Sequence, residues 1–213
     1  MRAGWSVLCS LRKLAFIYQT SEACTVSMVL ITYKMPLPEL IRRGEKTAVD
    51  FDQIKKIGSP HGVDLTFVEH KDLPAHPSLS TILGSHTACC VLMEVKHSSQ
   101  PIRHWVLVIG KPHLVYFDSL ALSLEHMYQI TKTEPKLIRA FKGLKVDMCH
   151  VRIQKNLSNV RDCGLHCSVR AVFHKYSNKE YYKFLKSFGS DTDATVVMMC
   201  LLHLVDMISL TIK

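Results

Sequence analysis

Apolar and polar residues alternate through the middle of the chain in a pattern that predicts a β-sheet. We expect strands at 88–95, 104–109 and 114–119, and only the letters GKPH separate the last two, which predicts a β-hairpin. Further strands are expected at 63–70 and 145–153. Together these segments predict a mainly antiparallel central sheet.

Helical spacing of apolar residues replaces this alternation in the second half of the chain. One or two helices are expected within 121–144, and others at 164–176, 178–187 and 193–210. Nearer the N-terminus, MPLPELIRRG indicates a short helix with a proline near its start and Gly44 after its end. The predicted fold class is therefore α+β, with helices flanking the sheet.

The length of 213 residues fits one ordinary domain, which can bury a core without help from disulfides or metals. No internal repeat, low-complexity tract or Gly/Ser linker divides the sequence. Residues 1–34 mix apolar and basic positions without a clear period. We expect an N-terminal extension of uncertain order there, followed by a single domain at 35–213.

Two features bear on the compartment of the protein. The apolar run 195–212 is almost long enough to cross a bilayer, but it contains His203 and Asp206, which favours a buried C-terminal helix over an anchor; a partner-binding helix is a third option. The eight cysteines lack the spacing of a disulfide framework, and no signal peptide stands out. We therefore expect free thiols in a reducing, intracellular compartment and no membrane partner.

The formal charge of +9 is concentrated in one region of the chain. Residues 131–190 hold 13 of the 27 Lys and Arg but only 4 of the 18 Asp and Glu. Two stripes at helical spacing lie within it, namely Lys132, Lys136, Arg139 and Lys142, and Lys175, Lys179, Lys183 and Lys186. One stripe alone is typical of a solvated helix face, but the two together favour a non-specific nucleic-acid partner held through its phosphates.

A polar loop ends abruptly at Asp162-Cys163-Gly164, where an apolar-periodic segment begins. A thiol at a helix N-terminus has a chemical use, because the partial positive charge and free N–H groups there stabilise the thiolate. A small buried hydrophobe is the alternative interpretation of such a cysteine. Cys167 lies one turn further on, but the sequence has no second close-spaced pair with ligand geometry, so no metal site is predicted.

The predicted hairpin supplies an imidazole and a carboxylate of the kind that activates a thiol. His104 begins one strand and Asp118 ends the next, so folding at 110–112 brings both to the same end of the hairpin. A turn of three or five residues places them on one face of the sheet, whereas a turn of four places Ser119 opposite His104. Each residue alone is ordinary, and their pairing depends on the length of the turn.

Taken in order, HWVLV, YFDSL, a glutamine-containing segment and DCGLHC resemble the motifs of the adenain and ubiquitin-like-protein (SUMO) protease superfamily of cysteine proteases. The resemblance covers about 88–176. It implies an adenain-like fold with Cys163 as the nucleophile at the N-terminus of a central helix. It also implies His104 as the general base and then acid, and Asp118 as the residue that orients the imidazole.

The oxyanion donor and the substrate cleft follow from the same resemblance. Family glutamines precede the cysteine by six or seven residues, whereas Gln154 precedes Cys163 by nine. Gln154 is preferred as the donor because it ends a strand-like run, and Asn156 is the alternative. Trp105 resembles the tryptophan that walls the cleft around a glycine-containing substrate, and Gly164 removes bulk where a substrate backbone would approach.

The chain has no counterpart of the upstream WLND-type motif of the SUMO proteases. It is therefore most similar to adenovirus-type maturation proteases of DNA viruses and virus-like transposons, which cleave precursor proteins after small and glycine residues. This implies an endopeptidase with no cofactor for its chemistry, acting in the nucleus or virion if the chain is viral. The resemblance also implies DNA and a peptide as candidate activators, with Cys149 in a place comparable to the cysteine that joins the peptide, although a buried structural thiol is the simpler interpretation of Cys149.

Two other functions stay open. One is a protease that processes or deconjugates a SUMO or other ubiquitin-like protein. The other is a catalytically inactive basic module associated with nucleic acid.

Overall fold

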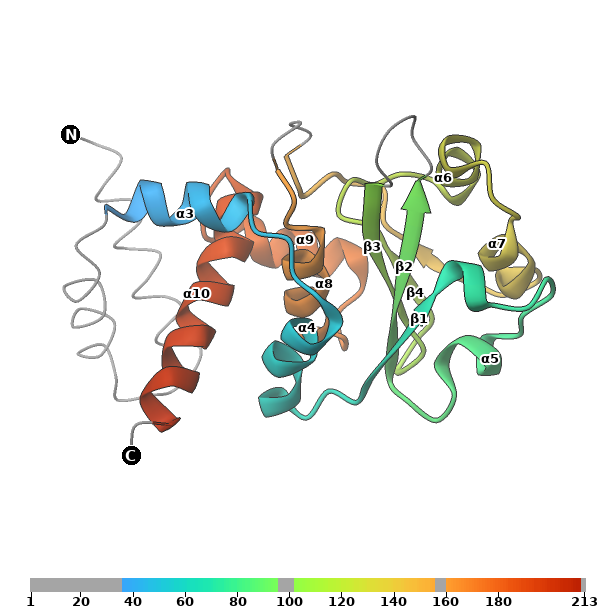
Figure 1. Cartoon of the computed structure of the whole chain (residues 1–213), viewed down its shortest axis with the longest axis horizontal. Helices are drawn as coiled ribbons and strands as arrows, with labels where there is room; N and C mark the ends of the chain where they lie inside the picture. Colours follow the sequence, from blue (N-terminus) through green and yellow to red (C-terminus); the bar gives the residue numbers. More distant parts are fainter. Residues whose placement is uncertain (1–35, 96–101, 156–159, 212–213) are drawn as a thin grey trace.

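The structure, a computed structural model, describes residues 36–95, 102–155 and 160–211 and contains a five-stranded sheet with helices on both faces (Figure 1). The strands, in their order across the sheet, are β1 (Leu65–Glu69), β2 (Ala88–Val95), β3 (Ile102–Ile109), β4 (Val115–Phe117) and β5 (Asp147–Met148). The two central pairings are antiparallel, while β1 with β2 and β4 with β5 are parallel. The sheet is therefore mixed.

The helices precede, interrupt and follow this sheet. They are α3 (Leu37–Glu45), α4 (Phe51–Gly58), α5 (Leu79–Leu83), α6 (Leu124–Thr131), α7 (Lys136–Phe141), α8 (Cys163–Val172), α9 (Asn178–Lys186) and α10 (Thr192–Thr211), with short 3-10 segments η1 (Ser59–His61) and η2 (His70–Asp72). The expected α+β class is confirmed. The N-terminal extension 1–34 lies outside the described residues.

The expectation of a mainly antiparallel sheet is wrong at both edges. Parallel neighbours need a crossover connection, whereas antiparallel ones can be joined by a short turn. The chain reaches β2 from β1 through η2 and α5, and it reaches β5 from β4 through α6 and α7. Each edge strand therefore runs parallel to its neighbour, β1 to β2 and β5 to β4.

Two helices were missed in the sequence although their caps are recognisable. The side chain of Asp50 accepts a hydrogen bond from the backbone N–H of Gln53 at 2.9 Å, and the Gln53 side chain accepts one from the N–H of Asp50 at 2.9 Å. This reciprocal capping box starts α4, and Ser78 with Thr81 starts α5 in the same way. At the other helix near the N-terminus, Gly44 lies inside α3 and not after its end.

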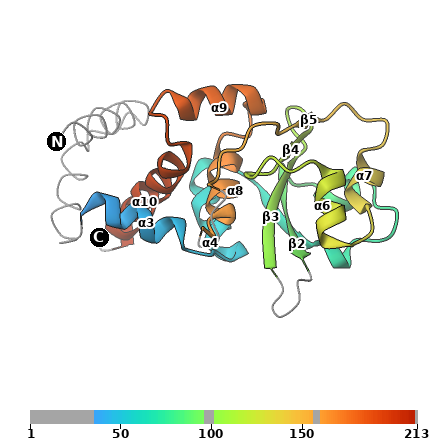
Figure 2. The same cartoon turned by 90° about the horizontal axis from the view of Figure 1, so that it is seen from above.

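Strand residues alternate between two cores, one on each face of the sheet. Trp105, Leu107 and Ile109 belong to the core that includes α4, α8 and α10, whereas Val106 and Val108 belong to the core that includes α6 and α7. Figure 2 shows these two groups of helices on opposite sides of β2 and β3. Because both faces are covered, strands such as β2 read as continuous apolar runs.

The C-terminal helix α10 packs against α3, α8 and α9. A buried C-terminal helix was expected, and the side chains of Val196 to Cys200 are buried. The side chains of His203 and Asp206 are not among those that the structure describes. Within the described ranges, no helix combines the length and apolar character needed to cross a membrane.

Candidate active site

Cys163 is the first residue of α8, the central helix of the molecule. This helix packs against β3, α4 and α10, and nine of its ten residues are buried. Gly164 lets the helix approach Val49 and Trp105 closely, because a Cβ there would lie 2.3 Å from Val49 Cγ2 and 3.1 Å from Trp105 Cδ1. Cys163 is consequently held at a fixed place beside the sheet.

The hairpin brings His104 and Asp118 together. Nε2 of His104 lies 2.9 Å from Oδ1 of Asp118, and both side chains are buried. Five residues, 110–114, connect the strands, and Leu107 pairs with Phe117. The turn is therefore the five-residue alternative, and its register puts His104 and Asp118 on one face of the sheet.

The same Asp118 oxygen is also held by the backbone that follows it. The backbone N–H of Leu120 donates to Oδ1 at 2.8 Å, so one carboxylate oxygen receives both a backbone N–H and the imidazole. Such a fixed acceptor determines the orientation and the tautomer of a histidine ring.

The thiol of Cys163 completes a three-residue cluster. Its Sγ accepts a hydrogen bond from the backbone N–H of Trp105 at 3.5 Å. Burial raises the pKa of Cys163, but hydrogen bonds from His104 and from the Trp105 and Gly164 backbones, with the charge of His104, outweigh burial and hold the pKa below its usual value. The environment therefore favours a thiolate.

The pKa of the His104 imidazole is shifted in the opposite direction, upward. Burial lowers the pKa of His104, but the charge and hydrogen bond of Asp118, together with Cys163, outweigh it and raise the pKa to about 10. A lowered thiol pKa beside a raised imidazole pKa favours transfer of the thiol proton to the imidazole.

No such activation reaches the other cysteines that the structure describes, which are likewise free. Burial raises the pKa of Cys149 to about 11 and that of Cys89 to about 12. Burial also raises the pKa of Cys90, Cys167 and Cys200. Among these described cysteines, Cys163 is the exception because its thiol lies against the imidazole of His104.

Gln154 is described and buried, whereas Asn156 lies outside the described residues. The Oγ of Ser119 donates to Oε1 of Gln154 at 2.6 Å, and the backbone N–H groups of Ile153 and Gln154 donate to the carbonyl of Ser119. Because the amide oxygen of Gln154 is engaged, its amino group is the end left to donate. Ser119, which follows Asp118, was not expected to hold this side chain.

Trp105 contributes to packing beside the thiol. Its Nε1–H donates to the carbonyl of Val49 at 3.0 Å. The ring of Phe67 packs edge-on against the Trp105 ring, with 5.5 Å between the ring centroids. Val49 and Trp105 also occupy the space beside Gly164, so packing alone requires a glycine there. Substrate contact by Trp105 and Gly164 stays a prediction.

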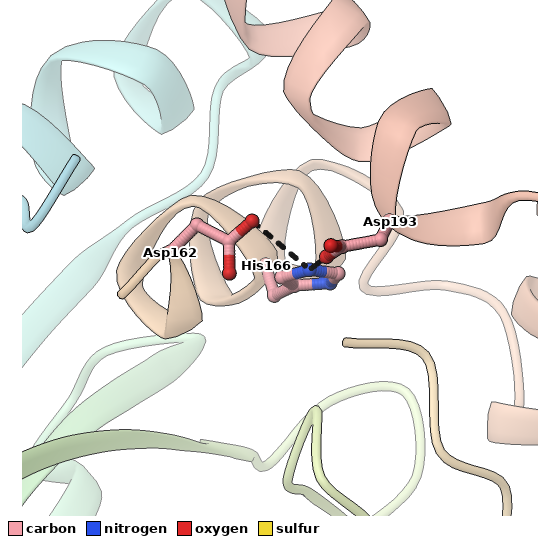
Figure 3. Close-up of side chains that lie close together, drawn as sticks. All are labelled: Asp162, His166 and Asp193. Atoms are coloured by element: carbon pink, nitrogen blue, oxygen red, sulfur yellow. Dashed lines mark hydrogen bonds and ion pairs between the residues drawn. The ribbon is translucent and has the colours of Figure 1, made fainter. Parts of the chain in front are cut away.

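A second cluster begins at Asp162, the residue before Cys163, and was missed in the sequence. It consists of Asp162, His166 and Asp193, all almost completely buried (Figure 3). The spacing of Asp162 and His166 by four residues indicates one helix face, but Asp193 lies 27 residues beyond His166 and no local pattern relates the two.

The two basic stripes lie on different parts of the molecule. Figures 1 and 2 both place α7 at the end away from α10, whereas α9 lies close to α10. Lys136 donates to the carbonyls of His70, Lys71 and Leu73, and Arg139 pairs with Glu134. The four lysines of the second stripe, Lys175, Lys179, Lys183 and Lys186, are exposed. DNA as a partner stays a prediction, and only the second stripe offers a fully exposed basic row.

No family model, curated protein or solved structure matches this chain. The function therefore has to be argued from the chemistry of the site.

Proposed function

We propose that the chain is a cysteine endopeptidase with a Cys163–His104–Asp118 triad, of the adenain and ubiquitin-like-protein protease type, with an adenain-like fold. The observation that carries the proposal is that one hairpin and the start of α8, which lies far from it in the sequence, meet at one thiol. A buried His104–Asp118 pair at 2.9 Å lies beside a cysteine that begins a buried central helix.

The residues support a two-step acyl transfer. The Cys163 thiolate attacks the carbonyl carbon of the scissile peptide, and the carbonyl electrons move onto oxygen. When the tetrahedral intermediate collapses, the C–N bond breaks and the His104 imidazolium gives its proton to the leaving amine. His104 then removes a proton from water, which attacks the thioester and releases the acid and the thiolate.

The negative oxygen formed in each step needs a donor that is already in position. The Cys163 backbone N–H, at the start of α8, and the amino group of Gln154 are the proposed donors. Ser119 fixes the amide of Gln154 in the orientation that such a role requires, because its hydroxyl occupies the amide oxygen.

The proposed substrates are precursor proteins with small or glycine residues at the cleavage site. The enclosed environment of Cys163 agrees with a narrow substrate backbone, since both Cys163 and Trp105 are less than a tenth exposed. DNA and a peptide remain proposed activators, and the triad itself needs neither for the chemistry.

The test is cleavage profiling of the purified full chain. A mixed peptide library and a folded SUMO or NEDD8 precursor are each incubated with the chain, and with a sample first alkylated at its thiols. We expect cleavage after small or glycine residues in the library by the untreated sample only. Cleavage restricted to the folded precursor would support the deconjugating protease instead, and no cleavage of either, with or without added DNA, would contradict a peptidase.

A further inference from the structure

The cluster that begins at Asp162 joins two helices through buried ionisable groups. Asp162 is the N-cap residue of α8, His166 lies in the first turn of that helix, and Asp193 lies in the first turn of α10. Nε2 of His166 is 2.6 Å from Oδ1 of Asp193 and 3.8 Å from Oδ2 of Asp162. Figure 3 shows both carboxylates directed toward the imidazole from the two helices.

The polar atoms of this cluster are poorly satisfied by the protein. Among the residues that the structure describes, neither oxygen of Asp162 has a hydrogen-bond partner, and the same is true of Asp193 Oδ2 and His166 Nδ1. Asp162 and His166 are 0 % exposed and Asp193 is 1 % exposed, so bulk water does not supply the missing partners. A buried carboxylate without partners is costly, and its presence calls for another positive group.

No side-chain cation within the described part of the chain fills this need. Asp162 and Asp193 form ion pairs there with His166 and with no lysine or arginine. The nearby Lys155 is already paired with Glu45 and Asp191. The two carboxylates converge on one imidazole, and a divalent cation bound between the three side chains would stabilise both carboxylates in their charged form.

The donor geometry suits such a cation. One ligand atom from each residue can be chosen so that all lie within 4.8 Å of one another. Carboxylate and imidazole donors bind first-row divalent metals at about 2.0–2.2 Å, which places the donors of one ion about 3 to 4 Å apart. The distance from Asp162 to His166 already fits, and Asp193 has to move back by less than about 1 Å to make room.

We propose that Asp162, His166 and Asp193 form a binding site for a divalent transition-metal ion that clamps the first turn of α8 to α10. The two helices already pack against each other, and the ion would tie them at the residue before Cys163. This inference does not depend on the proposed peptidase activity. A proton shared between the carboxylates is the competing way to relieve the same charge.

The test is a Mn²⁺ titration of the full-length Cys163→Ala chain, followed by electron paramagnetic resonance of free Mn²⁺. Manganese is chosen because it binds thiolates weakly, and Cys163→Ala removes the reactive thiol. We expect one Mn²⁺ bound per chain and a rise in melting temperature with Mn²⁺ concentration. The variants Asp193→Asn and Asp162→Asn should each weaken binding at least about tenfold.

The matched control is Asp64→Asn, which removes the carboxylate of an exposed His–Asp pair. His86 Nδ1 lies 2.8 Å from Asp64 Oδ1 at the surface, without a third ligand. This variant should bind Mn²⁺ like its parent. Absence of a bound ion in the parent chain, or equal losses in the control and cluster variants, would overturn the proposal and favour the shared proton. The Cys163→Ala titration can overturn the proposal by itself, so the test does not depend on whether the cluster variants fold.

Discussion

Replacing Cys163 with alanine is expected to abolish peptide cleavage, with a fall in kcat of about 10⁶-fold, the scale found when a nucleophile that acts with its own base is removed. The reason is that no other thiol in the described residues lies against His104, and burial raises the pKa of each of the others. The measurement is the rate of cleavage of the best library peptide under saturating conditions.

Cys149→Ala is the matched control for that substitution. Cys149 is 6 % exposed and Cys163 is 7 % exposed, so both changes remove a buried thiol of similar accessibility. Cleavage by the Cys149 variant should stay within a fewfold of the parent in the absence of any activating peptide. A Cys163→Ala chain that still cleaves at the parent's rate would exclude the nucleophile assigned to it.

Asp118→Asn is expected to lower kcat by about 10⁴-fold, the scale found when the orienting carboxylate of a catalytic triad loses its charge. The substitution nearly preserves the shape of the side chain but removes the acceptor charge that faces Nε2 of His104 at 2.9 Å. The imidazole then loses both the group that fixes its tautomer and the charge that stabilises its protonated form.

The pH profile separates this mechanism from simple damage to the fold. The pKa of His104 is raised to about 10, so the imidazolium keeps its proton through neutral pH and loses it as the pH rises through that value. The alkaline limb of kcat/KM should lie near pH 10 in the parent and move to lower pH in Asp118→Asn. Asp64→Asn, which alters the exposed His86 pair, should leave the limb in place. An unchanged alkaline limb in Asp118→Asn would contradict the role of Asp118.

The parts of the site that depend on local chain geometry could be predicted from the sequence. His104 and Asp118 are joined by one hairpin, so strand alternation and a short connection were enough to bring them to the same end. Cys163 could be placed at a helix start because the polar loop breaks there. The contact between the Trp105 N–H and the Cys163 Sγ joins residues 58 apart, and no spacing rule gives it.

The fifth strand is shorter than its sequence suggests, because the strand it pairs with is short. A strand was expected at 145–153, but β5 contains only Asp147–Met148 because β4 is itself three residues long. Beyond it, the backbone N–H of Cys149 donates to the carbonyl of Tyr116, and those of Ile153 and Gln154 donate to Ser119. These bonds bring Gln154 to Ser119, the residue after Asp118.

The end of the central helix α8 was also predicted wrongly, and a buried arginine binds the segment that follows it. A helix was expected to 176, but α8 ends at Val172. Nη1 of Arg170 donates to the carbonyl of Phe173 at 2.7 Å, and Nη2 donates to that of Tyr176 at 2.6 Å. These hydrogen bonds hold carbonyls of the segment that follows the helix, and residue propensities along the sequence do not reveal them.

The most direct test of the central claim is the alkylation rate of each cysteine in the native chain. The protein is treated with a small amount of iodoacetamide at pH 7, and the modified positions are followed over time by peptide mass spectrometry. Cys163 and Cys149 are almost equally exposed, so their rates report thiolate character and not access. The account predicts that Cys163 reacts at least about 100-fold faster than Cys149, whose pKa is raised to about 11. Equal rates at the two cysteines would contradict an activated thiol and, with it, the proposed peptidase.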